Sequence, residues 1–173
     1  MQFFSGFSLK NEEYFFDSFI KKDDFTLCGF SYGAIKAFEA TLQMREEGKR
    51  IDTLQLFSPA FFQSKGSKFH RLQLMAYRKN KKAYIEQFLD ACFAPIERQK
   101  VDHYETDISE LKELLKYEWS LAKLYELKNS GVAIEVYLGA KDNIVDASAA
   151  QDFFKEIATV TYIQKANHFL QIA

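Results

Sequence analysis

The chain has 173 residues, of which 23 are basic and 24 acidic, giving a formal net charge of -1. This length suffices for one hydrophobic core, so we expect a single domain over residues 1–173. The near-neutral balance excludes a general attraction to nucleic acid or to an anionic membrane. The 18 Phe and 9 Tyr predict either an apolar cleft or an aromatic-rich core.

The two cysteines, Cys28 and Cys92, do not have the spacing of a metal site or the number of a disulfide framework. Such cysteines are typical of a reducing compartment, and we expect a cytoplasmic protein without metal or cofactor. The opening segment, residues 1–7, is apolar but has no basic leader and no long hydrophobic run. It is expected to be a strand, not a signal peptide or a membrane span.

In chain order, a buried strand is predicted over residues 1–5 and an amphipathic helix from about Asn11 to Lys21. A second strand is predicted over residues 25–28. After a Gly-Phe-Ser-Tyr-Gly stretch, apolar residues repeat at helical spacing until Gly48, which supplies a helix stop. The pattern is strand, tight turn, helix.

The second part of the chain continues this alternation. Three more strands are predicted over Thr53–Phe57, Val132–Leu138 and Thr159–Ile163. Two helices are predicted, Ile108–Lys128 with an Asp107 cap and Ala147–Ile157 with an Asp146 cap. Alternating strands and helices indicate the α/β class, with a mostly parallel sheet of about five strands and helices on both faces.

Between Phe61 and about Tyr104 the pattern is helical, with no convincing strand. We interpret residues 61–104 as a helical lid inserted between the third and fourth strands. The alternative is that these are ordinary crossover helices covering the sheet, because any parallel crossover needs some helix.

The stretch Gly29-Phe30-Ser31-Tyr32-Gly33 matches the pattern G-x-S-x-G and lies between a predicted strand and a predicted helix. A serine at the apex of such a turn projects its hydroxyl into a cleft, and the flanking glycines let the neighbouring backbone pass. Ser31 is therefore the candidate nucleophile, and it needs a neighbouring base and an orienting acid. Cys28 lies on the strand before it and is expected to be buried.

The candidate acid is Asp142, in the turn that follows the strand ending near Leu138. Asp146 is the competitor, but its place before a predicted helix favours a capping role. A purely structural role for Asp142 as a turn former is also possible.

The candidate base is His168, which follows the last predicted strand. Open α/β sheets place their sites at the carboxyl ends of the strands, and His168 lies at that edge. The other two histidines, His70 and His103, fall in the inserted segment. The chain order Ser31, Asp142, His168 is that of hydrolases with a nucleophile on a strand-to-helix turn.

An oxyanion hole needs two backbone N–H groups near the nucleophile. Tyr32, directly after Ser31, is the first candidate donor. The second is Phe7, in the loop Ser5-Gly6-Phe7-Ser8 after the first strand, where Gly6 permits a sharp exit. A plain strand-to-helix turn is the alternative for this loop.

Together these segments resemble the α/β-hydrolase family over nearly the whole chain: Ser5-Gly6-Phe7-Ser8, Gly29-Phe30-Ser31-Tyr32-Gly33, Gly139-Ala140-Lys141-Asp142 and Asn167-His168-Phe169. Within it, the chain is similar to the pimeloyl-acyl carrier protein methyl ester esterases of biotin synthesis, most of all to their very small BioV type. Three departures stand out. The family loop usually reads His-Gly-x-Gly, and the family usually has another strand and helix between this loop and the elbow. The leading strand pair of the family is also absent from the predicted elements, so a reduced sheet is expected.

The resemblance implies hydrolysis of the methyl ester of a pimeloyl chain that is still attached to its carrier protein. Ser31 would form an acyl-enzyme that water then releases. His168 would carry the proton from the serine to methoxide, and Asp142 would hold the imidazole tautomer.

A basic run without any acidic residue spans residues 63–82. It comprises Lys65, Lys68, Arg71, Arg78, Lys79, Lys81 and Lys82. Acyl carrier proteins are acidic, so these residues are the candidate carrier-binding site, and Phe61, Phe62, Phe69, Leu72 and Leu74 are candidates for the pocket wall. The alternatives for the run are a solvated helix face and, less favoured, nucleic-acid binding.

Two other functions fit the same residues. A small-molecule carboxylesterase or acyl thioesterase would share the triad, because only the pocket selects the acyl donor. A catalytically inactive hydrolase scaffold could instead bind an acidic protein through its basic segment. We expect a monomer in each case.

Overall fold

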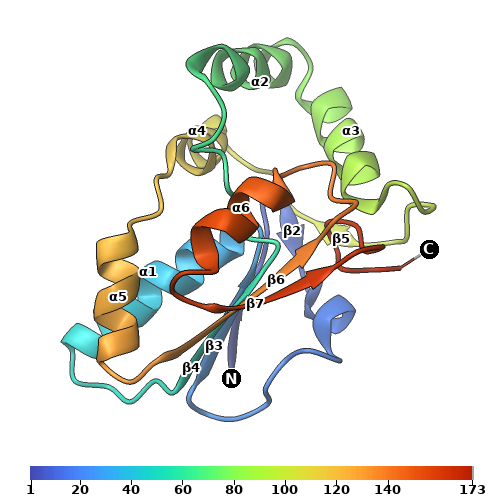
Figure 1. Cartoon of the computed structure of the whole chain (residues 1–173). Helices are drawn as coiled ribbons and strands as arrows, with labels where there is room; N and C mark the ends of the chain where they lie inside the picture. The colour runs from blue at the N-terminus through green and yellow to red at the C-terminus, as the bar shows by residue number, and fades with distance from the viewer. Residues whose placement is uncertain (173) are drawn as a thin grey trace.

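The computed structural model describes residues 1–172, and its centre is a five-stranded parallel sheet (Figure 1). The strand order is β1 (Gln2–Phe4), β3 (Thr26–Phe30), β4 (Thr53–Phe57), β6 (Ala133–Gly139) and β7 (Thr159–Ile163). Every neighbouring pair is parallel. The expected α/β class and the five expected strands are confirmed.

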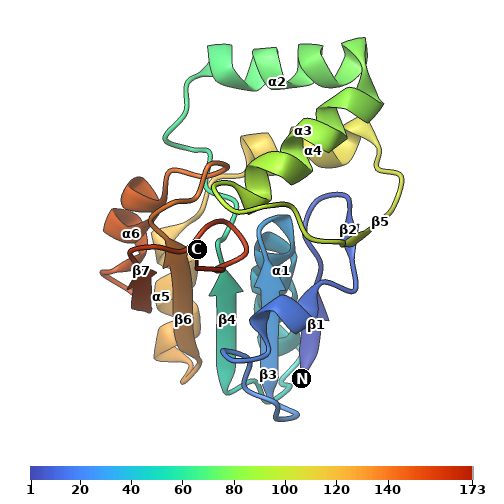
Figure 2. The same cartoon turned by 90° about the vertical axis from the view of Figure 1, so that its right-hand side faces the viewer.

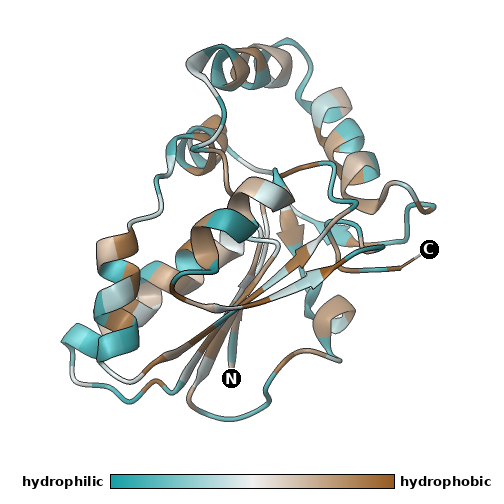
Figure 3. Cartoon of the chain, viewed as in Figure 1, coloured by the Kyte–Doolittle hydropathy of each residue, from teal (hydrophilic) through white to brown (hydrophobic). Residues whose placement is uncertain are grey.

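The central strands are buried on both faces. All five residues of β3 and all five of β4 are buried, and Figure 3 shows apolar colour along them. Continuous apolar runs are typical of parallel strands covered on both sides. The exception is Gln55, whose side-chain amide donates to Phe19 O and whose Oε1 accepts the Lys21 N–H, each at 2.9 Å. This buried glutamine holds residues 19–21 against the sheet.

Different elements cover the two faces of the sheet. One face carries α1 (Tyr32–Glu46), α5 (Leu121–Asn129) and α6 (Ala147–Phe154), which share an aromatic cluster of Phe38, Trp119 and Phe154. The other face carries the short 3-10 helix η1 (Glu13–Phe16) and the C-terminal segment, as Figure 2 shows. There the ring of Phe16 stacks on those of Phe57 and Phe169. Aromatic side chains therefore supply much of the packing on both faces.

The helix predicted over residues 11–21 is wrong. Within this segment only η1 is helical, and the two-residue strand β2 (Leu9–Lys10) directly precedes it. Asn11 has a φ of 58°, which lies outside the right-handed helical region. Tertiary contacts decide the local structure here, because the Lys21 N–H donates to a side chain of the sheet and not to a helical carbonyl.

The single helix predicted over residues 108–128 is also wrong. It is two helices, α4 (Ile108–Lys116) and α5, separated at residues 117–120. Buried Trp119 lies in the break, where its backbone N–H donates to Gln63 Oε1 at 2.7 Å and its indole N–H to Ala60 O at 2.9 Å. The predicted Asp107 cap is confirmed, since its Oδ1 accepts the Ser109 N–H at 2.6 Å.

Residues 61–104 contain α2 (Ser67–Lys79), α3 (Lys81–Phe93) and the two-residue strand β5 (Asp102–His103), which the sequence did not predict. β5 pairs antiparallel with β2, directly after the loop that follows β1. α2 packs against α3 and α4 above the carboxyl ends of the strands (Figures 1 and 2). Among residues 1–172, none of the helices has both the length and the apolarity to cross a membrane.

Candidate active site

Ser31 lies at the junction of β3 and α1 with a φ of 54° and a ψ of -113°. Close backbone contacts require glycine at positions 29 and 33, two residues before and after Ser31. A Cβ at position 29 would lie 2.1 Å from Gly33 O, and a Cβ at position 33 would lie 1.9 Å from Phe4 O. Because real Cβ atoms never approach a backbone oxygen so closely, only glycine fits both positions. The sequence pattern thus corresponds to a sharp turn that exposes the serine hydroxyl to a cavity.

The structure brings Ser31, His168 and Asp142 together from the ends of β3, β7 and β6. His168 Nε2 lies 3.0 Å from Ser31 Oγ, and His168 Nδ1 lies 2.6 Å from Asp142 Oδ2. The side chains of His168 and Asp142 are both 0% exposed. With Nδ1–H donating to the carboxylate, Nε2 is free to accept the serine proton, which is the arrangement of a nucleophile, base and orienting acid.

Asp142 is itself held by the turn in which it lies. Its Oδ1 accepts the N–H groups of Ile144 at 2.7 Å and Val145 at 3.0 Å, so Oδ2 is directed at His168. Asp146, the competing carboxylate, accepts the Ala149 N–H at 3.0 Å and caps α6. The two aspartates therefore have separate tasks, as their sequence positions predicted.

His168 is positioned by the C-terminal segment. Asn167 donates from Nδ2 to Phe93 O at 2.7 Å and accepts the Gln171 N–H at 3.0 Å. A Cβ at Gly139 would lie 2.4 Å from the carbonyl oxygens of residues 166 and 167, so the loops bearing Asp142 and His168 touch at backbone level. His70 and His103 take no part, because His70 Nε2 pairs with Phe62 O and His103 is exposed on β5.

The loop after β1 passes directly beside the elbow. Phe4 pairs with Gly29, and the carbonyl of Phe4 contacts Gly33. Phe7 is 2% exposed, lines the same cavity as Ser31, and has no protein acceptor for its N–H within residues 1–172. Tyr32 is the first residue of α1, where the N–H has no intrahelical acceptor. Both N–H groups are thus available as oxyanion donors.

Ser8 explains one departure from the family motif. Its φ is 62°, the left-handed conformation that glycine would adopt most easily. The serine is held there by a pair of contacts to Tyr104, because Ser8 Oγ donates to Tyr104 O at 2.9 Å and the Tyr104 N–H donates to Ser8 O at 3.1 Å. The loop therefore keeps the expected path without the fourth-position glycine.

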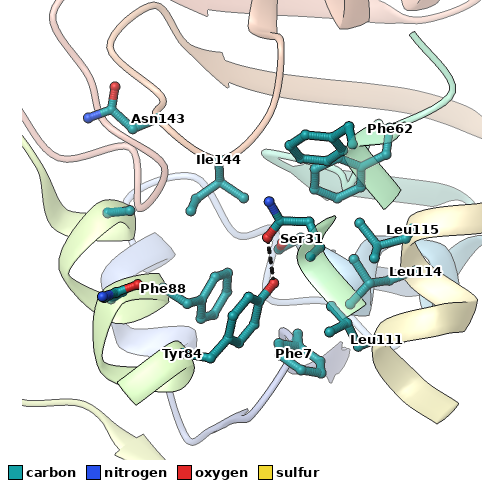
Figure 4. Close-up of a pocket in the computed structure, with 14 residues that line it drawn as sticks. Phe7, Ser31, Phe62, Tyr84, Phe88, Leu111, Leu114, Leu115, Asn143 and Ile144 are labelled. Carbon is teal, nitrogen blue, oxygen red and sulfur yellow. Dashed lines mark hydrogen bonds between the residues drawn. The ribbon is translucent and has the colours of Figure 1, made fainter. Parts of the chain in front are cut away.

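A cavity of about 240 Å³ opens above Ser31. Figure 4 shows its aromatic and aliphatic walls, which come from α2, α3, α4 and the loops after β1, β4 and β6. Its most prominent apolar members are Phe7, Phe62, Phe88, Leu111, Leu114 and Ile144. The residues of α3 and α4 were not predicted from the sequence, although their i, i+3 and i, i+4 spacing was a usable signal.

Of the residues expected in the pocket wall, only Phe62 and Phe69 line the cavity. The expectation is wrong for the others. Phe61 packs against Phe153 beside α6, Leu72 is 49% exposed, and Leu74 lies outside the lining. The apolar run contributes to the core and surface as well as to the pocket.

One polar pair interrupts this apolar lining. The hydroxyl of Tyr84 on α3 donates to Gln73 Oε1 on α2 at 2.9 Å, drawn as a dashed line in Figure 4. Burial raises the pKa of Tyr84 to about 12, so the phenol stays neutral and remains a donor. The pair joins the two helices across the cavity.

The candidate carrier-binding residues lie on α2 and at the start of α3, except Lys65, which lies in the turn before α2. Five are exposed and two half-buried: Lys68, Arg71, Arg78, Lys79 and Lys82 are exposed, and Lys65 and Lys81 are half-buried. Only Lys81 among them forms a salt bridge within residues 1–172, with Glu105 at 3.0 Å. α2 also exposes Leu72 and Met75, the latter at 56%, so its outer surface combines positive charge with apolar side chains.

No protein-family model and no curated protein matches the sequence. Solved structures do match. BioG from Haemophilus influenzae superposes with a TM-score of 0.60 at 12% identity, covering 98% of this chain and 88% of BioG. The chain has the α/β-hydrolase fold.

Two further structures give the same result. Est816, described as an N-acyl homoserine lactone degrading enzyme, superposes with a TM-score of 0.64 at 12% identity. The match covers 96% of this chain and 85% of the Est816 chain. Naproxen esterase from Bacillus subtilis superposes with a TM-score of 0.52 at 18% identity. The match covers 95% of this chain and 62% of the esterase chain. The chain spans less than two thirds of the length of several structures that it matches.

The first prediction follows from the different hydrogen-bond partners of Asp142, which contacts His168, and Asp146, which caps α6. Asp142→Asn keeps an oxygen for the N–H groups of Ile144 and Val145 but places an amide opposite His168, which favours the wrong tautomer. We expect kcat for ester hydrolysis to fall by about 10⁴-fold. Asp146→Asn, the matched control, keeps an N-cap side chain and retains activity within a few-fold. Equal losses in steady-state kinetics would remove Asp142 from the site.

The second prediction concerns Cys28, which is buried beside the elbow. Burial raises the pKa of its thiol to about 12, so only about one molecule in 10⁴ carries a thiolate there at pH 8. Iodoacetamide at that pH should leave both Cys28 and activity intact in folded protein, and should alkylate both cysteines in urea. Mass spectrometry of tryptic peptides checks this. Inactivation that parallels alkylation of Cys28 would contradict it.

Proposed function

We propose that this protein is a serine carboxylic ester hydrolase. The observation that carries the proposal is the line of two hydrogen bonds from Ser31 through His168 to buried Asp142, at the floor of an apolar cavity. The hydrolase and esterase structures of the same fold support it. A serine hydroxyl needs such a base to act as a nucleophile near neutral pH.

The mechanism follows from the positions of these groups. Ser31 Oγ attacks the ester carbonyl while His168 Nε2 takes the hydroxyl proton, and the oxyanion accepts hydrogen bonds from the N–H groups of Phe7 and Tyr32. His168 then gives the proton to the leaving alkoxide as the C–O bond breaks. Proton transfer of this kind contributes about 10²- to 10⁴-fold, and one oxyanion donor about 10²- to 10³-fold.

Water completes the cycle. It attacks the acyl-enzyme with His168 as the base, and the second tetrahedral intermediate collapses to a free carboxylate and regenerated Ser31. Asp142 stabilises the imidazolium in both halves of the reaction. No redox or group-transfer partner is needed.

For the substrate, we propose the methyl ester of a pimeloyl chain carried by an acyl carrier protein. Three observations support this choice. The cavity above Ser31, of about 240 Å³, has mostly apolar walls, which suit a short acyl chain. The exposed basic residues of α2 complement an acidic carrier. The fold likeness to BioG extends over nearly the whole chain.

A third prediction tests reaction and nucleophile together. Incubation of methyl pimeloyl carrier protein with the wild type should remove one methyl group, and Ser31→Ala should leave the substrate unchanged. Intact-protein mass spectrometry reads the loss directly, and a fluorophosphonate should label the wild type at Ser31. Absence of labelling in folded protein would favour an inactive scaffold, and a preference for aryl esters or thioesters would favour a small-molecule esterase or thioesterase.

A fourth prediction tests the carrier-binding role of α2. Reversing Arg71, Arg78 and Lys82 to Glu should lower kcat/KM for the carrier-bound ester by about 10-fold or more at low salt, because charge complementarity accelerates association. Turnover of a small methyl ester should be unchanged.

The control reverses three exposed lysines outside residues 63–82, of which Lys49 follows α1 and Lys123 and Lys128 lie on α5. This variant has the same change in net charge and should lose little activity toward the carrier-bound ester. Equal losses in the two triple variants, or equal losses on carrier and small ester, would exclude docking through α2.

A further inference from the structure

One fully buried carboxylate has no task in the mechanism above. Glu12 is 0% exposed and lies in the segment where the sequence predicted an amphipathic helix. Its Oε1 accepts the Gly6 N–H at 2.6 Å, while its Oε2 is buried without a partner among residues 1–172. Burying a carboxyl group with one unsatisfied oxygen raises the free energy of the folded state. A contribution to folding stability therefore does not explain why a glutamate lies at position 12.

The group that Glu12 holds is the backbone that presents Phe7. The peptide between Gly6 and Phe7 is planar and trans, so its C=O and its N–H point in opposite directions. The C=O of this peptide accepts the Leu9 N–H at 3.2 Å, which turns the Phe7 N–H to the other side. On the other side of the Gly6 Cα, the N–H of Gly6 itself donates to Glu12 Oε1. The loop is therefore restrained immediately before and immediately after the rotatable bonds of Gly6.

The need for this restraint follows from Gly6 itself. Glycine has the widest choice of backbone conformations, so an unrestrained Gly6 could rotate the next peptide away from the cavity. The rings and methyl groups around it limit only its side-chain space, since a Cβ there would lie 3.0 Å from Phe30 Cδ1 and 3.1 Å from Leu9 Cδ1. A hydrogen bond to the Gly6 N–H restrains rotation where packing does not.

We propose that Glu12 is a positioning residue for the oxyanion hole: its carboxyl oxygen anchors Gly6 so that the Phe7 N–H faces the tetrahedral intermediate formed on Ser31. The inference rests on the proposed ester hydrolase function and deepens it. Glu12 does not touch the substrate and acts only through the backbone of the loop. Its effect is greatest where negative charge develops, because a donor aimed at the oxyanion stabilises the transition state more than the ground state.

The protonation state of Glu12 does not alter this role. Burial raises the pKa of its carboxyl group, and the hydrogen bond from the Gly6 N–H opposes that rise. Either form keeps an oxygen that accepts the Gly6 N–H. Acceptance by this oxygen, and not charge, is therefore the property to test.

The experiment compares Glu12→Ala with Glu12→Gln on a small methyl ester. Glu12→Ala should lower kcat by about 10- to 100-fold with KM changed less than about 3-fold, which is the pattern of a lost transition-state interaction. Glu12→Gln, which keeps an amide oxygen for Gly6, should retain kcat within about 5-fold. Glu13→Ala is the matched control, because Glu13 is exposed on η1, and it should behave as wild type.

A second readout separates positioning from general loss of structure. A trifluoromethyl ketone analogue of the substrate forms a tetrahedral adduct with the serine, so its inhibition constant should rise in Glu12→Ala by about the same factor as kcat falls. Thermal unfolding measures the folded fraction for each variant. If Glu12→Ala does not fold, Glu12→Leu replaces it, since leucine fills the space without an acceptor.

Three results would overturn the inference: unchanged ketone affinity in folded Glu12→Ala, an equal loss in Glu12→Gln, or a loss confined to KM. Failure of the proposed function is seen separately, because the wild type itself would then neither hydrolyse esters nor bind the ketone.

Discussion

The contact on which the rest of the site depends is the imidazole of His168, hydrogen-bonded on one side to Ser31 and on the other to Asp142. Three chain segments far apart in sequence must meet within a few ångströms for this to occur. A parallel sheet achieves this because the carboxyl ends of β3, β6 and β7 lie along one edge, where the loops can converge. The close contacts of Gly33 with the first strand and of Gly139 with the last loop then set the spacing at backbone level.

The small size of the molecule makes aromatic packing important to this arrangement. On the face opposite α1, the covering segments are the short 3-10 helix η1 and the C-terminal segment, and ring-on-ring contacts supply much of the packing. Phe16, Phe30, Phe93 and Phe169 form a continuous group there, and the ring of Phe30 also packs on that of His168 at 4.8 Å between centroids. Aromatic rings offer large buried area with few rotatable bonds, which suits the support of a catalytic imidazole. The aromatic-rich composition thus serves both the core and the cleft.

Local patterns in the sequence predicted the sheet well, because each central strand is a nearly continuous apolar run with a clear end. The positions of Ser31, Asp142 and His168 were predictable for the same reason, since each follows such a strand. Residues 11–21 and 117–120 were not predictable, because there Gln55 and Gln63 draw backbone N–H groups away from helical partners. The contribution of Glu12 depends on a contact with the loop after β1, which periodicity does not reveal, whereas the helical spacing of the cavity residues on α3 and α4 was a signal in the sequence.

The pairing of β2 with β5 limits how the segment above the cavity can move. At its start, the segment is fastened where the Trp119 N–H donates to Gln63, and at its end it is fastened by β5 and Tyr104 to the loop bearing Phe7. The segment that carries α2 and α3 thus lies between two hydrogen-bonded attachments to the rest of the fold. The second of these attachments is made to β2, which directly follows the loop that bears Phe7, so the covering helices and this loop share one backbone support.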